Sequence, residues 1–464
     1  MPRLRLELLF AILLLGLLAT ACSESDEKSD GDTDGESGGT FPPESQTPLY
    51  TKGLILPVNS LPCIPVSTGV EQTRCNHHGS TVAELPDGTV AALWYHGEEE
   101  KSKDSRLVWS RLAPGETSWT WPEVVFDDPD LSEGNATLWV GEDGTLYIFF
   151  VTIFGNGWDE THVRLMRSHD NGATWDTPVT LREQYCFNVR HRPLRLANGE
   201  LLLPLYHECL GLPVFMRSGD DFQTWTEEYD TSGAYLMNHV GQIQPALIGL
   251  PDGKLACITR DGTATRRIKR MESSDYGKTW TESLPLGLPN AGTSVDWVRL
   301  LDGHVVVVFN NDPDRRFPLT VALSRDEGKT FVAVRDIVTD CEEGGDCSHH
   351  YPSIMQSQRD GTIWVTYTHK RETIGWVHFN EAWLLEGTEK AFLHCFTGEQ
   401  CSDGFCFKSC AEKKSCDAEL ECVNDACRQH CQADADCGEG LRCDTSKLCI
   451  PAYDPERKDA NCQP

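Results

Sequence analysis

The stretch GLPDGKLACITRDGTATRRIKRMESSDYGKTW, Gly249 to Trp280, contains two local patterns that recur along this chain of 464 residues. Its first part places an Asp-Gly pair between two apolar, alternating runs, the strongest short-range signal for a β-hairpin. Its last part, SSDYGKTW, is a polar turn that ends in tryptophan. The copies of these two patterns together predict the fold.

The hairpin pattern occurs six times, and each copy is centred on an Asp-Gly or Asn-Gly pair. The six glycines are Gly88, Gly144, Gly199, Gly253, Gly303 and Gly361. Successive glycines are 56, 55, 54, 50 and 58 residues apart, which leaves room for two more short strands in each unit. The pattern therefore predicts an all-β fold, a six-bladed β-propeller. A two-sheet β-sandwich is the rival fold, but it would not need so regular a unit.

The turn S-x-D-x-G-x-T-W has three good copies and a degenerate fourth that carries Phe222 in place of glycine. A short acidic side chain can accept hydrogen bonds from turn amides. Glycine allows a positive φ, and the aromatic residue can pack between blades. We therefore expect the acidic residues of the good copies to be scaffold residues and not catalytic ones: Asp170, Asp275 and Asp326.

The N-terminus has the features of an export signal. An apolar run, Leu8 to Leu18, follows two arginines and is too short to cross a bilayer comfortably as a mature helix. It ends in LATAC, which resembles the lipobox of bacterial lipoproteins. The resemblance implies lipidation of Cys22, anchoring at a membrane, and an exported protein of the bacterial outer membrane or cell surface. Ordinary signal cleavage near Ala21 is the alternative.

Twenty cysteines indicate an oxidising compartment, and twelve of them lie between Cys395 and Cys462. Most of these twelve repeat with a period of 21 residues, which favours a disulfide-stapled region over a zinc site. In the body, Cys257 is expected to be a free core thiol. The expected local pairs are Cys63 with Cys75, Cys186 with Cys209, and Cys341 with Cys347.

The chain therefore divides into four parts: a signal peptide (1–21), an acidic tether (22–48), a six-bladed propeller (49–390) and a small cysteine-rich tail (391–464). The net charge of −30 argues against a nucleic-acid partner, because phosphate binding needs concentrated Lys and Arg.

The S-x-D-x-G-x-T-W turn is the Asp box, or bacterial neuraminidase repeat, and the sequence resembles the sialidase superfamily. HHGSTVAELPDG, IQPALIGLPDGKLACITR and HYPSIMQSQRDGTIWVTYTHKR are similar to sialidase-like BNR proteins, and the similarity spans about residues 60–380. The resemblance implies a central pocket where three arginines clamp a substrate carboxylate. A tyrosine would be the nucleophile with a glutamate as its base, and an aspartate would be the acid/base. We expect no cofactor and no catalytic metal.

Four residues match these roles by position. Tyr351 lies ten residues before Gly361, where the nucleophile is expected, although a buried structural tyrosine is the alternative. Asp104 lies in the loop that carries the acid/base aspartate, although a solvated loop carboxylate is equally consistent with that position. Arg260 and Arg316 stand where the second and third arginines are expected.

Three residues depart from the family pattern. His78 stands where the first arginine is usual, ten residues before its hairpin glycine. Gln244 lies near the place of the activating glutamate, and an amide cannot act as a base. Glu208, from the preceding blade, is a candidate substitute carboxylate, and a surface role for it is as plausible.

The resemblance implies a retaining exo-α-sialidase-like glycosidase that releases sialic acid or a related carboxylate-bearing sugar from an acidic glycan. One alternative is a polysaccharide lyase on uronic-acid glycans, in which His77, His78 and Tyr351 would move protons. Another alternative is a non-catalytic glycan-binding surface lipoprotein.

Overall fold

The computed structural model describes residues 47–58, 75–228, 241–263, 265–341 and 345–386, together with the backbone of six short strands between residues 399 and 451. The predicted signal peptide, Cys22 and most of the tether lie outside the described residues. Nothing in the structure therefore tests the lipoprotein prediction or its export.

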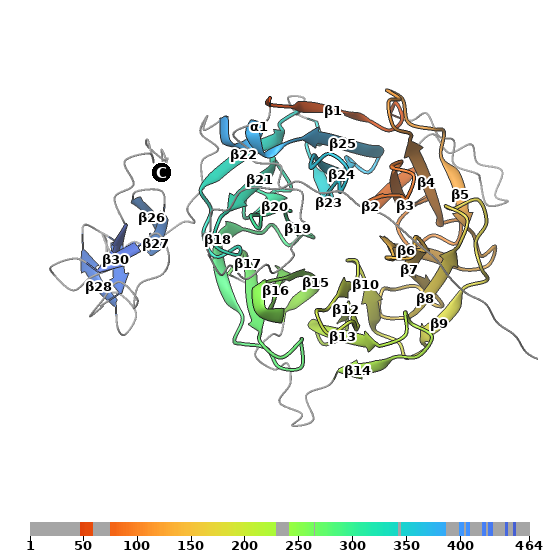
Figure 1. The fold of residues 1–464 in the computed structure, drawn as a ribbon, viewed down its shortest axis with the longest axis horizontal. Helices are drawn as coiled ribbons and strands as arrows, with labels where there is room; N and C mark the ends of the chain where they lie inside the picture. The colour runs from red at the N-terminus through yellow and green to blue at the C-terminus, as the bar shows by residue number, and fades with distance from the viewer. Residues whose placement is uncertain are drawn as a thin grey trace, which may run out of the picture. The chain divides into compact units, whose positions relative to one another are not determined.

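Six antiparallel sheets follow one another around a ring, as predicted (Figure 1). The first two blades are β2 (Asn76–Glu84), β3 (Val90–Gly97), β4 (Arg106–Leu112) and β5 (Glu123–Phe126), then β6 (Ser132–Val140), β7 (Leu146–Ile153), β8 (Thr161–Ser168) and β9 (Val179–Arg182). The third blade comprises β10 (Phe187–Val189), β11 (Leu194–Arg195), β12 (Leu201–His207), β13 (Leu212–Ser218) and β14 (Thr226–Glu228).

The fourth and fifth blades are β15 (Gln242–Gly249), β16 (Leu255–Asp261), β17 (Arg267–Ser273) and β18 (Leu284–Pro289), then β19 (Asp296–Arg299), β20 (Val305–Asn310), β21 (Leu319–Ser324) and β22 (Ala333–Val338). The sixth blade is β23 (His349–Gln356), β24 (Ile363–His369) and β25 (Thr373–Phe379), completed by β1 (Tyr50–Leu54) from the other end of the domain. Strand β1 pairs with β25 from Tyr50 opposite Phe379 to Leu54 opposite Gly375, and this pairing closes the ring.

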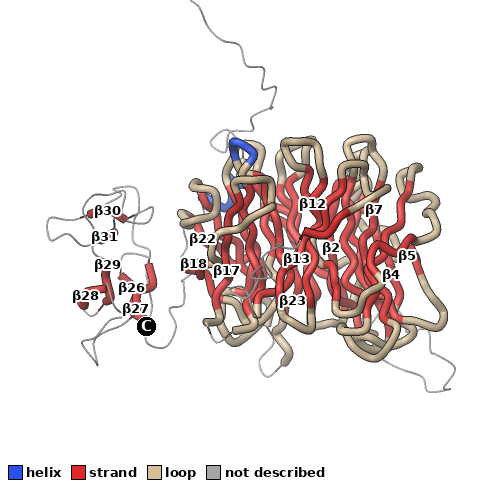
Figure 2. The backbone as a smooth tube through the Cα atoms, turned by 90° about the horizontal axis from the view of Figure 1, so that it is seen from below, coloured by secondary structure: helices blue, strands red, loops and turns tan. Residues whose placement is uncertain are grey.

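The six hairpin glycines join the innermost strand of each unit (β11 in the third blade) to the next strand, and all have φ between +70° and +93°. These positive angles explain why Asp-Gly and Asn-Gly mark the blades, because other residues adopt this conformation only at a cost. Strands run through the thickness of the ring and the loops gather at its two faces (Figure 2). The regular hairpins therefore position the loops that shape the centre.

The four Asp-box turns join the last two strands of blades two to five, and all use the same hydrogen-bond network. In each, the aspartate carboxylate accepts a backbone N–H from the threonine four residues on at 2.8 Å. The serine hydroxyl accepts the N–H of the glycine, or of Phe222, at 2.8 Å. The expected scaffold role is confirmed. In two turns the tryptophan packs against the preceding blade: Trp175 on Trp109 and Trp280 on Phe215.

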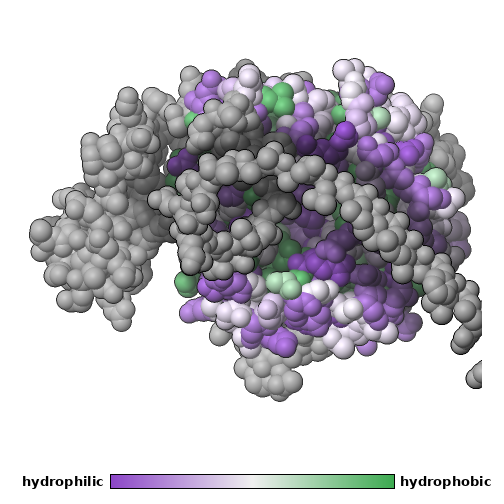
Figure 3. Space-filling view, in the orientation of Figure 1, coloured by the Kyte–Doolittle hydropathy of each residue, from purple (hydrophilic) through white to green (hydrophobic). Residues whose placement is uncertain are grey.

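Apolar side chains fill the spaces within and between neighbouring blades. One cluster joins Val151 and Val163 of blade two to Leu203 of blade three, and a comparable cluster joins blades five and six. The surface coloured in Figure 3 is mostly hydrophilic, with apolar residues in small separate groups. The core therefore lies between the sheets and not around the ring axis.

The cysteines of the body behave largely as expected. Cys186 bonds to Cys209 and Cys341 bonds to Cys347, while Cys257 is a buried free thiol. Cys63 lies outside the described residues, so its predicted pairing with Cys75 is not tested.

The tail is described by three two-stranded hairpins, and the prediction of extensive disulfide bonding there is not tested. The hairpins pair β26 (Glu399–Ser402) with β27 (Phe405–Lys408), β28 (Leu420–Val423) with β29 (Ala426–Gln429), and β30 (Leu441–Cys443) with β31 (Cys449–Pro451). After β25 comes one short helix, α1 (Glu381–Glu386). Within the described parts of the chain, no helix has the length and apolar character needed to span a membrane.

Candidate active site

The innermost strands of four blades carry a β-bulge at nearly the same distance from the hairpin glycine. The register shifts in β2, β6, β15 and β23. Within each shift one residue has a positive φ: Gly79 (+69°), Asn135 (+45°), Gln244 (+56°) and Tyr351 (+49°). A bulge redirects a side chain out of the alternating pattern of a strand. The three non-glycine residues at these bulges all line one cavity.

This cavity has a volume of about 210 Å³ and receives side chains from all six blades. Its lining residues are Glu100, Asn135, Trp158, Tyr206, Glu208, Ile243, Gln244, Arg260, Arg316, Tyr351 and Arg371. Five of the seven site residues predicted from the sequence are in this set. The structure does not bring the other two, Asp104 and His78, into the lining.

Tyr351 lies at the centre of the constellation. Its phenolic oxygen accepts a hydrogen bond from Arg260 Nη1 at 2.9 Å and another from Gln244 Nε2 at 3.2 Å. Gln244 therefore donates to the tyrosine and does not accept its proton. The His78 ring packs behind Tyr351 at a centroid distance of 4.3 Å, and only 1% of His78 is exposed. The prediction that His78 helps bind substrate is not supported by this position, because the bulge at Gly79 leaves His78 buried.

Arg316 comes from the loop between β20 and β21, and two hydrogen bonds hold its guanidinium group in place. Its Nη1 donates to His350 Nδ1 at 2.6 Å, and its Nη2 donates to the Gly292 carbonyl at 3.2 Å. Burial, reinforced by Arg316, lowers the pKa of His350 to about 3. The imidazole is therefore neutral, and its Nε2 donates to Ser348 Oγ at 2.6 Å. This arrangement fixes the direction of the Arg316 guanidinium.

Arg371 is a third cavity arginine that the sequence reasoning missed. It lies in the tight turn between β24 and β25 with φ at +59°, after Lys370 at +52°. Two consecutive non-glycine residues in this region store strain of about 1–3 kcal/mol each, which the surroundings must support. The Arg371 carbonyl accepts the His77 N–H at 3.0 Å, and Lys370 N–H donates to the Ser348 carbonyl at 2.9 Å. Backbone hydrogen bonds therefore hold the strained turn to β2 on one side and to the residue before β23 on the other.

The three guanidinium groups influence one another. Burial lowers the pKa of Arg316, and the positive charges of Arg260 and Arg371 lower it further. Arg371 forms an ion pair with Glu100. A cluster of cations in a recessed site is a strong binding site for an anion, and guanidinium groups match the geometry of a carboxylate.

The acidic residues of the site differ from expectation. Asp104 is only 5% exposed, and its two carboxylate oxygens accept the Glu98 N–H at 3.0 Å, while Ser102 Oγ donates at 2.6 Å. The Asp104 carboxylate therefore stabilises the conformation of its own loop. Glu100 from the same loop reaches the cavity instead, where Trp158 Nε1 donates to it at 2.9 Å. Glu208 also lines the cavity, as expected for a substitute carboxylate.

Arg190 lies buried beside Tyr351, with its guanidinium carbon 5.3 Å from the centre of the tyrosine ring, and the sequence did not single it out. It is 1% exposed, and its Nη2 donates to the carbonyls of Ser80 at 3.0 Å and Tyr351 at 2.9 Å. It thereby links blade three to the bulged strands of blades one and six. Arg190 and Asn135 both lie nine residues before a hairpin glycine, as Gln244 does, so this offset was the signal that could have found them.

Two groups of potential metal ligands occur among the described residues, and neither contains a residue of the cavity lining. They are Cys186 with His207 and Cys209, and Asp302 with His304 and Glu381. The first is engaged by the disulfide, and the second is a hydrogen-bonded cluster of two carboxylates around an imidazole.

Comparison with solved structures identifies the same fold at low sequence identity. NanB sialidase from Streptococcus pneumoniae is similar with a TM-score of 0.54 and 13% identity, over 66% of this chain and 69% of that one. The leech intramolecular trans-sialidase has a TM-score of 0.55 and 14% identity, over 66% and 68%. Trypanosoma rangeli sialidase has a TM-score of 0.56 and 17% identity, over 74% of this chain and 61% of that one. These similarities show the propeller fold alone.

No curated protein matches the chain in a sequence search. The family model described as a BNR repeat-like domain matches residues 88–365, a range that includes all six hairpin glycines and all four Asp boxes. The first strand of the first blade, and the end of β24, β25 and β1 in the sixth blade, lie outside the match. That match covers more than half of the chain. The chain therefore belongs to the BNR repeat-like domain family.

Proposed function

We propose that the protein is a sialidase-like glycoside hydrolase that releases a terminal carboxylate-bearing sugar, sialic acid or a close relative, from an acidic glycan. The observation that carries this proposal is that three guanidinium groups, from blades four, five and six, line the cavity that holds Tyr351, and that one of them, Arg260, donates to the Tyr351 hydroxyl. A carboxylate bound by the arginines would be attached to the carbon that Tyr351 attacks.

Tyrosine suits this position because it is a neutral nucleophile. An anionic carboxylate nucleophile would be repelled by the sugar carboxylate at short range. The hydrogen bonds from Arg260 and Gln244 orient the phenolic oxygen and stabilise the negative charge that develops on it. Attack by Tyr351 followed by hydrolysis retains the anomeric configuration.

The lyase alternative has less support in this cavity. It requires a histidine beside Tyr351 to exchange protons with a uronate, and the two candidates, His77 and His78, are 3% and 1% exposed. Trp94 Nε1 donates to His77 Nδ1 at 3.0 Å, and His78 Nδ1 lies 3.0 Å from Thr368 Oγ1. Burial lowers the pKa of both rings well below the ordinary value. Both histidines therefore serve as neutral packing groups.

The test is to incubate the purified protein with a fluorogenic sialoside and, in parallel, with a panel of uronate glycans. The proposal expects release of the fluorophore and no gain of ultraviolet absorbance from an unsaturated uronate. Tyr351→Phe should lower kcat by at least about 10²-fold, since the covalent route is lost. Binding without turnover by both proteins would instead support the glycan-binding alternative.

We also propose that the protein is exported and anchored through a lipid on Cys22, by resemblance of LATAC to a lipobox. Expression of the full chain in a bacterium with and without Cys22→Ser tests this. The proposal expects the wild-type protein in the membrane fraction with the added mass of a lipid, and the variant in the soluble fraction. Equal soluble fractions for both would contradict it.

A further inference from the structure

The proposed hydrolysis needs a group that gives a proton to the leaving oxygen, and Asp104 does not occupy the cavity that holds Tyr351. Its carboxylate accepts hydrogen bonds from the Glu98 amide and the Ser102 hydroxyl and is almost fully buried in its own loop. The cavity has two other carboxyl groups, Glu100 and Glu208.

Glu100 is unsuited to donating a proton because both its oxygens are already acceptors. Trp158 Nε1 donates to Oε1, and Arg371 Nη1 donates to Oε2. Glu100 therefore serves to hold Arg371.

Glu208 has the contrasting environment. Its side chain makes no hydrogen bond and no ion pair within the described part of the chain, although it is only partly exposed. Burial raises the pKa of the Glu208 carboxyl, Arg260 opposes the rise, and Asp159 adds to it. Of the two cavity carboxyl groups, Glu208 is therefore the one whose oxygens are not already engaged by donors from the described residues, and a raised pKa favours a group that gives up a proton.

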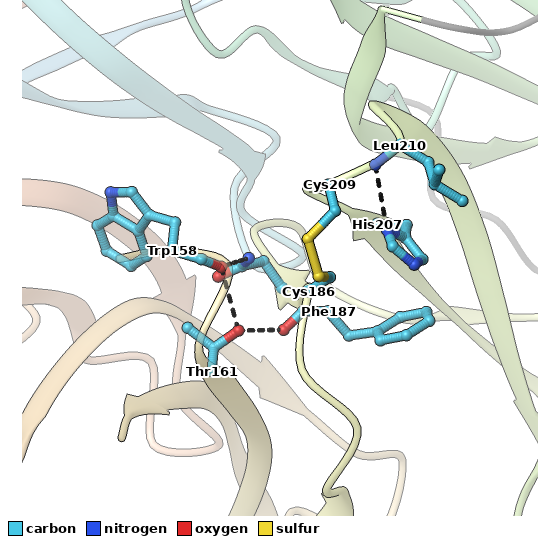
Figure 4. The surroundings of a disulfide bond; sticks show 8 residues. Trp158, Thr161, Cys186, Phe187, His207, Cys209 and Leu210 are labelled. Atoms are coloured by element: carbon cyan, nitrogen blue, oxygen red, sulfur yellow. Dashed lines mark hydrogen bonds between the residues drawn. A yellow bond between two sulfur atoms is a disulfide. The ribbon is translucent and has the colours of Figure 1, made fainter. Parts of the chain in front are cut away.

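The Cys186–Cys209 disulfide, shown in Figure 4, lies directly next to Glu208 in the chain and fixes the backbone there. Cys209 bonds to Cys186 across the blade with a Cα separation of 5.5 Å. Glu208 N–H donates to the Cys186 carbonyl at 2.6 Å, and Gly211 N–H donates to the His207 carbonyl at 2.8 Å. The turn that presents Glu208 is therefore tied to β10 on one side and closed on itself on the other. A proton donor needs this kind of fixed placement.

We propose, resting on the hydrolase function above, that Glu208 is the catalytic acid/base of the site and that the Cys186–Cys209 disulfide positions it. In the first step the Glu208 proton passes to the glycosidic oxygen, which leaves with the electron pair of its bond to the sugar. The Tyr351 oxygen bonds to the anomeric carbon and releases its own proton to water. In the second step a water molecule attacks that carbon, gives its proton to Glu208, and returns Tyr351 as a phenolate that water reprotonates.

The test compares two substrates with the same acidic sugar: one linked to lactose, a poor leaving group, and one linked to 4-methylumbelliferone, a good one. Glu208→Gln should lower kcat/KM for the lactose-linked substrate by about 10²–10⁴-fold. The loss for the aryl-linked substrate should be less than about tenfold, because a good leaving group needs little protonation. The alkaline limb of the pH profile should also disappear, which loss of packing alone would not cause.

Asp104→Asn and Glu100→Gln are the competing variants, and Glu99→Gln, on the exposed neighbour, is the matched control. Neither competitor should show a loss that depends on the leaving group, and the control should match the wild-type protein. If Asp104→Asn shows the selective loss, or if Glu208→Gln lowers both substrates equally, the assignment of Glu208 is wrong. If Tyr351→Phe retains full activity, the hydrolase function itself fails, and with it this proposal.

A second variant tests the disulfide. Cys186→Ser combined with Cys209→Ser should lower kcat for the lactose-linked substrate at least about tenfold, with KM changed less than twofold and with the wild-type circular dichroism spectrum. Glu208→Gln introduced into this double variant should then have a smaller effect than in the wild-type protein. Equal effects in both backgrounds would contradict a positioning role.

Discussion

Replacement of Arg190 by methionine should weaken the whole propeller. The guanidinium is buried, and its two shortest hydrogen bonds go to the carbonyls of Ser80 and Tyr351 at 3.0 and 2.9 Å. Three longer contacts, at 3.3–3.4 Å, reach Gly79, Ser294 and Pro352. Methionine fills similar space and makes none of these bonds.

The magnitude follows from the two short bonds. A hydrogen bond to a charged group contributes about 1.5–3 kcal/mol, so losing two of them costs about 3–6 kcal/mol. Removal of the buried charge itself returns part of this, because burial disfavours the charged guanidinium and lowers its pKa. We therefore expect the free energy of unfolding to fall by about 2–4 kcal/mol.

Urea unfolding followed by tryptophan fluorescence measures this change, provided the urea dependence is the same in both proteins. Arg315→Met is the matched control, because the Arg315 side chain is 72% exposed and its ion pair is with Asp312, three residues away in the same loop. The control should change stability by less than about 0.5 kcal/mol. A loss below about 1 kcal/mol for Arg190→Met would refute the view that this arginine joins the three blades.

Three further predictions concern strain, pH and the third arginine. Phe222→Gly removes backbone strain of about 1 kcal/mol, because glycine adopts a positive φ freely, but it also deletes a buried ring that contributes about 3–5 kcal/mol to stability. Calorimetry should therefore show a lower Tm for the variant. A higher Tm would show that the strain outweighs the packing. Hydrogen bonds to Asp302 and Glu381 raise the pKa of His304 from 6.5 to about 9, so its contribution to stability is complete below pH 6.5 and is lost as the pH rises through about 9. The Tm of His304→Gln should therefore fall less than the Tm of the wild-type protein as the pH rises between these values. An equal fall in Tm for both proteins would contradict the effect. Arg371→Lys should raise KM for an acidic substrate about tenfold or more by losing bidentate binding, whereas an uncharged analogue should be unaffected; equal changes for both would argue against a carboxylate site.

The ring could be predicted from the sequence because its signals are local. Each hairpin needs a residue with positive φ, and Asp-Gly or Asn-Gly supplies it at Gly88 as at Gly303. The Asp boxes are equally local, since aspartate, serine and glycine satisfy one another within five residues. A pattern whose interactions all lie within a single turn can therefore be predicted from the sequence alone, and the structure confirms these turns.

The cavity was harder to predict because it depends on bulges and loops. A strand with strict alternation would not show that the side chain nine residues before the hairpin glycine is turned toward the axis, as at Asn135 and Gln244. The same bulge in the first blade falls on Gly79, so His78 beside it remains buried. Arg371 lies in the turn between β24 and β25, the two middle strands of the sixth blade, where no repeat pattern marks it. The loop before β4 presents Glu100 to the cavity in place of Asp104.

The central claim is that Tyr351, surrounded by three arginines, attacks an acidic sugar. The most direct measurement is the proton NMR spectrum of the first product formed from a sialoside, recorded with the wild-type protein and with Tyr351→Phe. The account predicts a free acidic sugar that first appears with the anomeric configuration of the substrate, and almost none with the variant. A first product of inverted configuration, an unsaturated uronate from a uronate glycan, or equal turnover by the variant would contradict it.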